Sequence, residues 1–176
     1  MTISLAIDTS TSQTIVGIIE DGVVLFEEAH DGATDHGRAL SELVAKALKT
    51  SKPPHQVVVG MGPGPFTGLR VGIAFAQTFG LARNIPVIGV CSLDAIKVDQ
   101  DEYTVAIDAR RKEIYCASYK DGLRISGPTV SRPENVENFI IDIYPDMGKL
   151  VELSTTQSIT EPMYLRRPDA VPTAER

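Results

Sequence analysis

The sequence has few basic residues and no long apolar run, and each shortage argues against a class of protein. Its 17 Lys and Arg face 23 Asp and Glu over 176 residues, which gives a formal charge of −6. A protein that grips nucleic acid unaided needs a basic surface to neutralise phosphates, so this composition argues against one. No apolar stretch approaches the roughly 20 residues that span a bilayer, and no secretory signal pattern opens the chain. The two local basic clusters, Arg110-Arg111-Lys112 and Arg166-Arg167, are interpreted as a solvated turn and a solvated tail.

Cysteine and histidine are also scarce. Cys91 and Cys116 are the only cysteines, which fits a reducing compartment better than a disulfide framework, so we expect a cytoplasmic protein. The three histidines show no metal-binding spacing, and neither a His-x-x-x-His nor a Cys-x-x-Cys pair occurs. With 43% hydrophobic and 23% charged residues, the chain has enough apolar side chains for the core of one domain or two small lobes.

The strongest organisational signal is a repeat. Ala6-Ile7-Asp8 recurs as Ala106-Ile107-Asp108, and the hairpin signal Asp21-Gly22 recurs as Asp121-Gly122 at the same interval. In each half a strand, a polar turn, a second strand, Asp-Gly and a third strand follow one another. The sequence therefore predicts a duplicated antiparallel meander.

Between and after the meanders, periodicity predicts further elements. Helices are expected over about 35–49 and 67–83, with short strands at 57–59 and 86–90. The second half predicts one helix over 133–144 and a last strand over 149–153. We expect an α/β fold of the two-lobed actin, Hsp70 and sugar-kinase type, by analogy with the repeat. We expect a first lobe over residues 1–98, a shortened second lobe over 99–154 and an extended tail over 155–176.

A glycine-rich block, Gly62 to Gly72, contains the loop between a strand and the start of the next helix, a place where phosphates often bind. Its spacing matches neither the P-loop nor the dinucleotide fingerprint, and Pro63 and Pro65 lack the N–H donors of an anion cradle. The amides of Phe66, Thr67 and Gly68 could still face a ligand. A structural tight turn is the favoured interpretation.

Asp8, Thr9 and Ser10 form the other candidate site, because an aspartate and hydroxyls at a strand end approach phosphate in two-lobed kinases. Its counterpart Asp108 is followed by Ala109-Arg110-Arg111 instead of small hydroxyl residues or glycine. We interpret the first set as the remnant of a phosphate loop, with strand-end capping as the alternative.

The helix after the glycine-rich loop carries a stripe of small residues at every fourth position, Gly68, Gly72, Ala76 and Gly80. Glycine in a helix costs about 1 kcal/mol relative to alanine, so the stripe indicates close packing. The partner is either the lobe itself or a helix of another chain.

Several blocks resemble the TsaB (YeaZ) family, the glycoprotease-like relatives of TsaD. They are Ala6–Ser10, the loop Gly62–Gly72, Pro86–Val90, Ile107–Tyr115 and the tail Glu161–Ala170. The resemblance implies a two-lobed fold with a second lobe shorter than the family's. It implies partnership with TsaD and with the ATPase TsaE in transferring a threonylcarbamoyl group to the adenosine beside the tRNA anticodon, with only indirect contact to tRNA.

The resemblance also implies that this chain is not itself an enzyme. TsaD carries a metal-binding His-x-x-x-His whose positions fall here at Ser92 and Ile96, and neither side chain can replace imidazole. No cofactor is implied, although a nucleotide at a subunit junction stays open. A small-molecule kinase or ATPase of the same fold is the alternative, and a metallopeptidase has almost no support among the residues.

In TsaB proteins the first two helices form the interface with TsaD, or with a second copy when TsaD is absent. Carried onto this sequence, the resemblance and the stripe together predict these interface residues: Leu40, Leu43, Ala47, Gly68, Leu69, Gly72, Ile73, Ala76 and Gly80.

Overall fold

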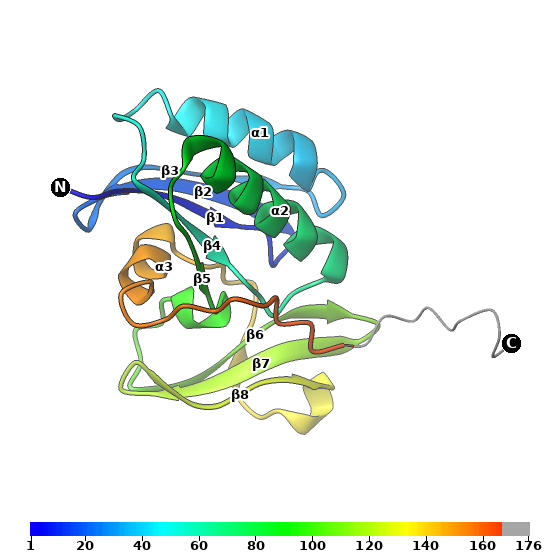
Figure 1. Ribbon diagram of the computed structural model, residues 1–176. Coiled ribbons are helices and arrows are strands. Elements are labelled where there is room, and N and C mark those ends of the chain that lie inside the picture. The colour runs from blue at the N-terminus through cyan, green and yellow to red at the C-terminus, as the bar shows by residue number, and fades with distance from the viewer. Residues whose placement is uncertain (167–176) are drawn as a thin grey trace, which may run out of the picture.

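The computed structural model describes residues 1–166, which form two sheets joined into two lobes (Figure 1). The first sheet has five strands in the order β3-β2-β1-β4-β5, and the second has four in the order β8-β7-β6-β9. The predicted two-lobed α/β fold with a duplicated meander is confirmed.

The two meanders are built alike. In the first lobe β1 (Ile3–Asp8), β2 (Gln13–Glu20) and β3 (Val23–Asp31) are antiparallel, and β4 (Gln56–Gly60) pairs parallel with β1. In the second lobe β6 (Glu102–Arg110), β7 (Glu113–Lys120) and β8 (Leu123–Ser131) repeat the meander, and β9 (Phe139–Ile140) pairs parallel with β6. Both Asp-Gly turns adopt positive φ angles. The shared strand order supports the duplication.

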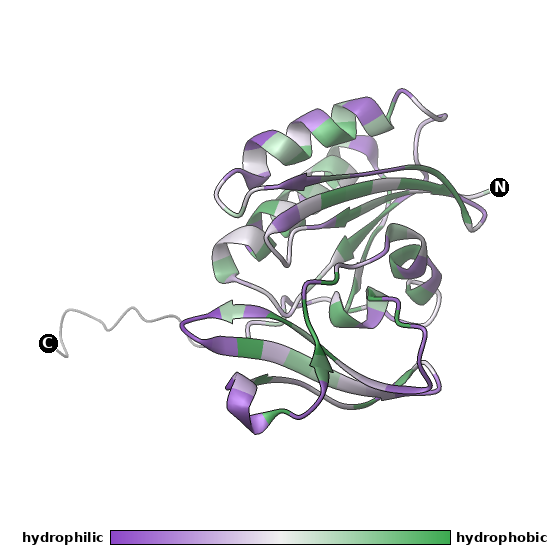
Figure 2. Cartoon of the chain, turned by 180° about the vertical axis from the view of Figure 1, so that it is seen from behind, coloured by the Kyte–Doolittle hydropathy of each residue, from purple (hydrophilic) through white to green (hydrophobic). Residues whose placement is uncertain are grey.

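Three helices cover the first sheet on both faces. On one face lie α1 (His36–Ala47) and α2 (Phe66–Arg83), side by side, and the strand β5 (Val87–Val90) follows them. Figure 2 shows hydrophilic and hydrophobic segments alternating along α1, as expected for a helix with one buried face. On the other face lie α3 (Met147–Leu153) and the short 3-10 turn η1 (Leu93–Ala95). Within residues 1–166 no helix is long and apolar enough to cross a membrane.

Two predicted elements are wrong, and both lie after the second meander. The expected helix over 133–144 is instead a 3-10 turn, η2 (Pro133–Asn135), followed by β9. The expected strand over 149–153 belongs to α3, because the Asp146 carboxylate accepts the Lys149 N–H at 2.7 Å and caps a helix there. Met147 and Leu150 are fully buried against the first sheet, so residues 147–153 pack on that lobe although the expected boundary assigned them to the second.

The segment from 154 to 166, which we call the strap, has no regular structure and runs over both lobes (Figure 1). The Gln157 amide reaches the backbone N–H of Cys91 and the carboxylate of Asp94. The N–H groups of Ile159 and Met163 donate to Gly89 and Met61. The predicted tail therefore runs along both lobes up to residue 166, while 167–176, including Arg167, lie outside the described part.

Candidate functional site

Asp8 ends the central strand β1 and is fully buried. One carboxylate oxygen accepts the Ser10 N–H and hydroxyl at 2.8 and 2.6 Å, and the other accepts the Ser92 hydroxyl at 2.6 Å. Burial raises the pKa of Asp8, although these hydrogen bonds act in the opposite direction. The Asp8 side chain therefore connects the end of β1 to the segment after β5, and it is not presented to solvent.

The Thr9 side chain also makes its hydrogen bonds within the first lobe. Its hydroxyl donates to the Gly68 carbonyl at 2.8 Å and lies 3.2 Å from the Gly72 N–H, which donates to it. A Cβ atom at Gly72 would overlap this hydroxyl and lie 3.3 Å from the Thr9 Cβ. The first two turns of α2 thus fill the space beside the strand end.

These contacts correct the phosphate-loop interpretation of Asp8, Thr9 and Ser10. All three residues are at most 1% exposed, and their side-chain oxygens that are buried have partners within the chain. A Cβ atom at Gly64 would collide with the backbone of Ser10, which shows how closely the glycine-rich loop approaches them. The loop acts as the tight turn that the sequence favoured, and strand-end capping describes Asp8 best.

Ionisation of Asp8 gives a testable pH dependence of stability. Its pKa lies above the ordinary 3.8, so the folded protein holds this proton more tightly than the unfolded chain. Stability from this group is full below about pH 4 and is lost as the pH rises through the folded pKa. We expect urea denaturation to show that Asp8→Asn gains stability relative to the wild type over this range. If the free energies of unfolding of the two proteins changed with pH in parallel, this role of Asp8 would be contradicted.

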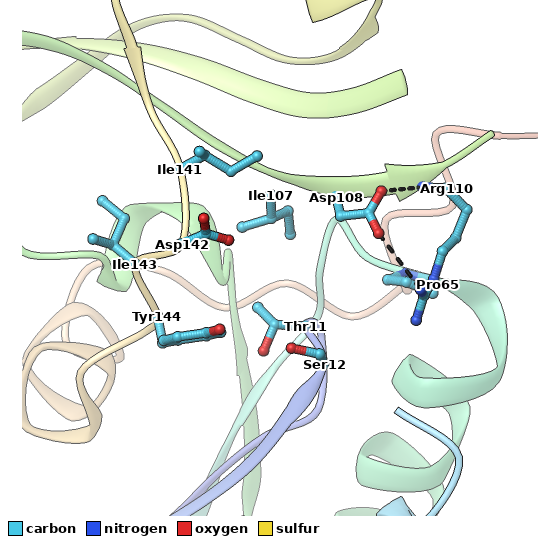
Figure 3. Close-up of a pocket in the computed structure, with 10 residues that line it drawn as sticks. All are labelled: Thr11, Ser12, Pro65, Ile107, Asp108, Arg110, Ile141, Asp142, Ile143 and Tyr144. Carbon is cyan, nitrogen blue, oxygen red and sulfur yellow. Dashed lines mark hydrogen bonds and ion pairs between the residues drawn. The ribbon is translucent and has the colours of Figure 1, made fainter. Parts of the chain in front are cut away.

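The cavity between the lobes is small (Figure 3). Its volume is about 160 Å³, and it lies between the β1–β2 turn, the start of α2, the end of β6 and the segment after β9. This volume is below the roughly 300–1,000 Å³ typical of small-molecule sites. Asp108 lies at its wall and accepts the Arg110 N–H at 2.7 Å, with the guanidinium 3.5 Å away. The lining residues are Thr11, Ser12, Pro65, Ile107, Asp108, Arg110, Ile141, Asp142, Ile143 and Tyr144.

The structure also corrects the predicted interface residues. All nine are buried in the first lobe itself, namely Leu40, Leu43, Ala47, Gly68, Leu69, Gly72, Ile73, Ala76 and Gly80. The small-residue stripe faces Thr9 and His36 at one end and Val87 at the other. A helical period identifies a buried face without showing which partner buries it, so the intramolecular alternative is the right one for these side chains.

The solvent-facing side of α2 is a different set of residues. Leu81 is 85% exposed, and Ala74 and Thr78 are exposed on the preceding turns. The half-buried rings of Phe75 and Phe79 stack at 6.0 Å beside them. We call Ala74, Phe75, Thr78, Phe79 and Leu81 the outer face of α2. It is an accessible part of the C-terminal half of this helix.

Sequence reasoning missed a partly buried polar cluster where the strap meets both lobes. Asp94 accepts the Tyr119 hydroxyl and the Gln157 amide at 2.7 Å each, and Arg124 lies 3.5 Å away. Cys91 belongs to the same cluster, and burial raises the pKa of its thiol to about 12, which makes it a poor nucleophile. No motif marks these residues, since they come from three distant segments, at 91–94, 119–124 and 157. Among residues 1–166 no group of His, Cys, Asp and Glu side chains is arranged to hold a metal ion.

Comparison with known proteins gives consistent relatives. A family model described as "TsaD: tRNA N6-adenosine threonylcarbamoyltransferase" matches residues 26–167. An uncharacterized protein of Mycobacterium tuberculosis is 40% identical over 97% of this chain and 94% of its own length. The tRNA threonylcarbamoyladenosine biosynthesis protein TsaB of Escherichia coli is 35% identical over 66% of this chain, and that of Bacillus subtilis is 31% identical over 68%.

Coverage and structure refine this picture. The chain spans about half the length of the curated TsaB proteins that it matches, 54% in Escherichia coli and 56% in Bacillus subtilis, and 57% of an uncharacterized protein of Mycobacterium leprae. YeaZ from Pseudomonas aeruginosa has the same fold, with a TM-score of 0.71 and 22% identity over 88% of this chain and 91% of that one. A second structure, described as similar to peptidase YEAZ from the same organism, has a TM-score of 0.80 and 22% identity over 94% and 100% of the two chains.

Proposed function

Because this chain belongs to the TsaB (YeaZ) family, we propose that it is the non-catalytic subunit that binds and stabilises a TsaD-type transferase during threonylcarbamoylation of tRNA. The observation that carries the proposal is the outer face of α2. It carries the exposed side chain of Leu81 and the half-buried rings of Phe75 and Phe79, and Arg83 lies 5.3 Å over the Phe79 ring at its edge. A face of this kind, with aromatic rings and a flanking arginine, has the composition of a protein interface.

A scaffold role fits the residues at the positions where TsaD holds its metal. Ser92 donates its hydroxyl to Asp8, and Ile96 is only 3% exposed within the core of the second lobe. Neither offers a free ligand atom. The alternative of a kinase or ATPase is disfavoured for a related reason, since the carboxylate that would approach a metal-bound phosphate is fully buried and hydrogen-bonded.

The same surface accommodates two partners in turn. In the absence of the transferase, a second copy of this chain is proposed to cover the outer face of α2 and give a homodimer. TsaE is proposed to join once the transferase is bound, and the whole assembly is proposed to act in the cytoplasm. If the second copy and the transferase bury the same face, they compete for it, so binding of the transferase displaces the second copy.

Reconstitution with a TsaD-type protein and TsaE of the same organism tests the proposal. We expect tRNA modification to require this chain and to fall at least about tenfold with Leu81→Asp, because a charge is then placed in the apolar interface. Leu81 is 85% exposed, so the variant should keep its stability within about 0.5 kcal/mol. Leu123→Asp, at a residue 73% exposed in the second lobe, is the matched control and should modify tRNA normally. Full modification without this chain would refute the scaffold role.

A further inference from the structure

The fold brings together two basic clusters that are far apart in the sequence. The guanidinium of Arg166, near the end of the strap, lies 3.4 Å from the Arg110 carbonyl and pairs with Glu113. In Figure 1 the end of the strap, the tip of the β6–β7 hairpin and the first turn of α2 lie together on the right. Arg110 and Pro65 line the same cavity, so the hairpin tip is also continuous with the start of α2 (Figure 3). The interpretation as a solvated turn holds for Arg110, whose side chain is 55% exposed, whereas the Arg166 side chain is 26% exposed and ion-paired, so this end of the tail packs against the turn.

Two aromatic rings lie between these cations. Phe66 and Tyr164 are 45% and 39% exposed, and their ring centroids are 4.8 Å apart. Arg70 lies 5.1 Å over the Phe66 ring. We call Phe66, Arg70, Arg110, Lys112, Tyr164 and Arg166 the basic aromatic surface.

The charge of this surface is opposite to that of the chain. Its four cations are Arg70, Arg110, Lys112 and Arg166. Among the described residues, Asp108 pairs with Arg110 and Glu113 pairs with Arg166, in a chain of net charge −6. A groove that adjoins the cavity between the lobes is lined by Glu27, Glu28, Asp142 and Asp146 with one lysine, Lys97, and Asp142 also lines the cavity itself. Because the charges are separated in this way, the basic side attracts a polyanion even though the whole chain is acidic.

The hairpin tip supports a role for these side chains. Arg110, Arg111 and Lys112 have φ angles of 64°, 55° and 62°, a region that costs a residue with a side chain roughly 1–2 kcal/mol. The Asp-Gly turns of the two meanders adopt such angles more easily. Three long cationic side chains occupy this costly backbone region. We infer that their charge is needed more than a turn free of backbone strain.

We propose that the basic aromatic surface contacts the RNA substrate directly. Arg70, Arg110, Lys112 and Arg166 bind phosphates, and the exposed rings of Phe66 and Tyr164 stack on an unpaired base. An unpaired loop of RNA offers both groups at once, whereas an acidic peptide has no base to stack. This inference rests on the proposed function, in which the chain acts within an RNA-modifying assembly, and it replaces the expected indirect contact with a direct one.

The test compares two double variants in the complex of this chain with its TsaD-type partner. Arg110→Ala with Lys112→Ala removes two cations from the surface, and Lys120→Ala with Arg132→Ala removes two exposed cations elsewhere in the second lobe. Binding of an anticodon stem-loop RNA is titrated over a range of salt concentrations. We expect the first pair to weaken binding roughly tenfold and to lower the slope of log affinity against log salt by about 0.7 for each phosphate that the surface no longer binds. The control pair should bind as the wild type does.

The other outcomes separate this inference from the proposed function. If the complex forms and both pairs bind RNA equally, direct contact is refuted and the scaffold role stands. If the first pair releases the partner subunit, the surface is a protein interface and the inference is again refuted. If the wild-type chain forms no complex, the proposed function fails, and the same RNA is titrated against the chain alone at low salt. There, weaker binding by the first pair than by the control supports the contact, and equal binding refutes it.

Discussion

Ala76→Arg is expected to unfold the first lobe. Ala76 is fully buried in the main core cluster of that lobe, so the arginine would either bury a charge without a partner or open the packing between α2 and the sheet. An unpaired buried charge costs about 3–5 kcal/mol, out of the roughly 5–15 kcal/mol that stabilises a typical domain. Urea denaturation and far-ultraviolet circular dichroism would show a lower midpoint or no folded state.

Ala74→Arg is the matched control for this substitution. Ala74 lies two residues earlier on the same helix and is exposed on the outer face of α2. We expect this variant to fold with a stability within about 0.5 kcal/mol of the wild type and to lose binding to the TsaD-type partner that we propose. If Ala76→Arg folded normally and Ala74→Arg did not, α2 would have to be turned about its axis relative to the structure.

Gly60→Ala is expected to have the second large effect. A Cβ atom at this last residue of β4 would overlap a carboxylate oxygen of Asp8 and lie 2.5 Å from the Ser92 hydroxyl oxygen. Both groups are buried, and Asp8 accepts the Ser92 hydroxyl at 2.6 Å. The alanine would break that hydrogen bond or displace β4, at a cost of about 3 kcal/mol or more. Chemical denaturation measures this loss directly.

Gly37→Ala is expected to stabilise the protein, in contrast to Gly60→Ala. Gly37 is in the first turn of α1, and no atom lies within 4 Å of the position that a Cβ atom would take. Because alanine favours the helix over glycine by up to about 1 kcal/mol, this variant is expected to be slightly more stable than the wild type. Equal losses for the two variants would show that the close approach at Gly60 is not what constrains it.

The fold could be predicted from the sequence mainly because the repeat is local. Each meander is marked by short apolar runs and an Asp-Gly turn, so the sequence predicts both. The part after the second meander could not be predicted in this way, because residues 149–153 are a short stretch with three apolar residues, and its length fits a strand or a helix. The Asp146 cap and the packing of Met147 and Leu150 on a sheet over 50 residues away decide for the helix. Neither is visible in a short window of sequence.

The candidate site shows the same limit. Asp8 and the small-residue stripe were correctly singled out, but both serve the interior of the lobe, because a pattern of burial does not name its partner. The proximity of the two basic clusters could not be predicted either. Arg110 and Arg166 are 56 residues apart, and only the path of the strap brings the second beside the first.

The position of α3 also bears on how the chain folds during synthesis. The strands of the first sheet are complete at Val90, yet one of its faces is covered by residues 147–153. A nascent chain that has just released its first lobe from the ribosome therefore presents the apolar side chains of Ala6, Ile15, Ile19 and Val58 without their cover. Closing this face requires contacts over more than a hundred residues, which slows folding and leaves the growing chain open to aggregation until the second meander has been made.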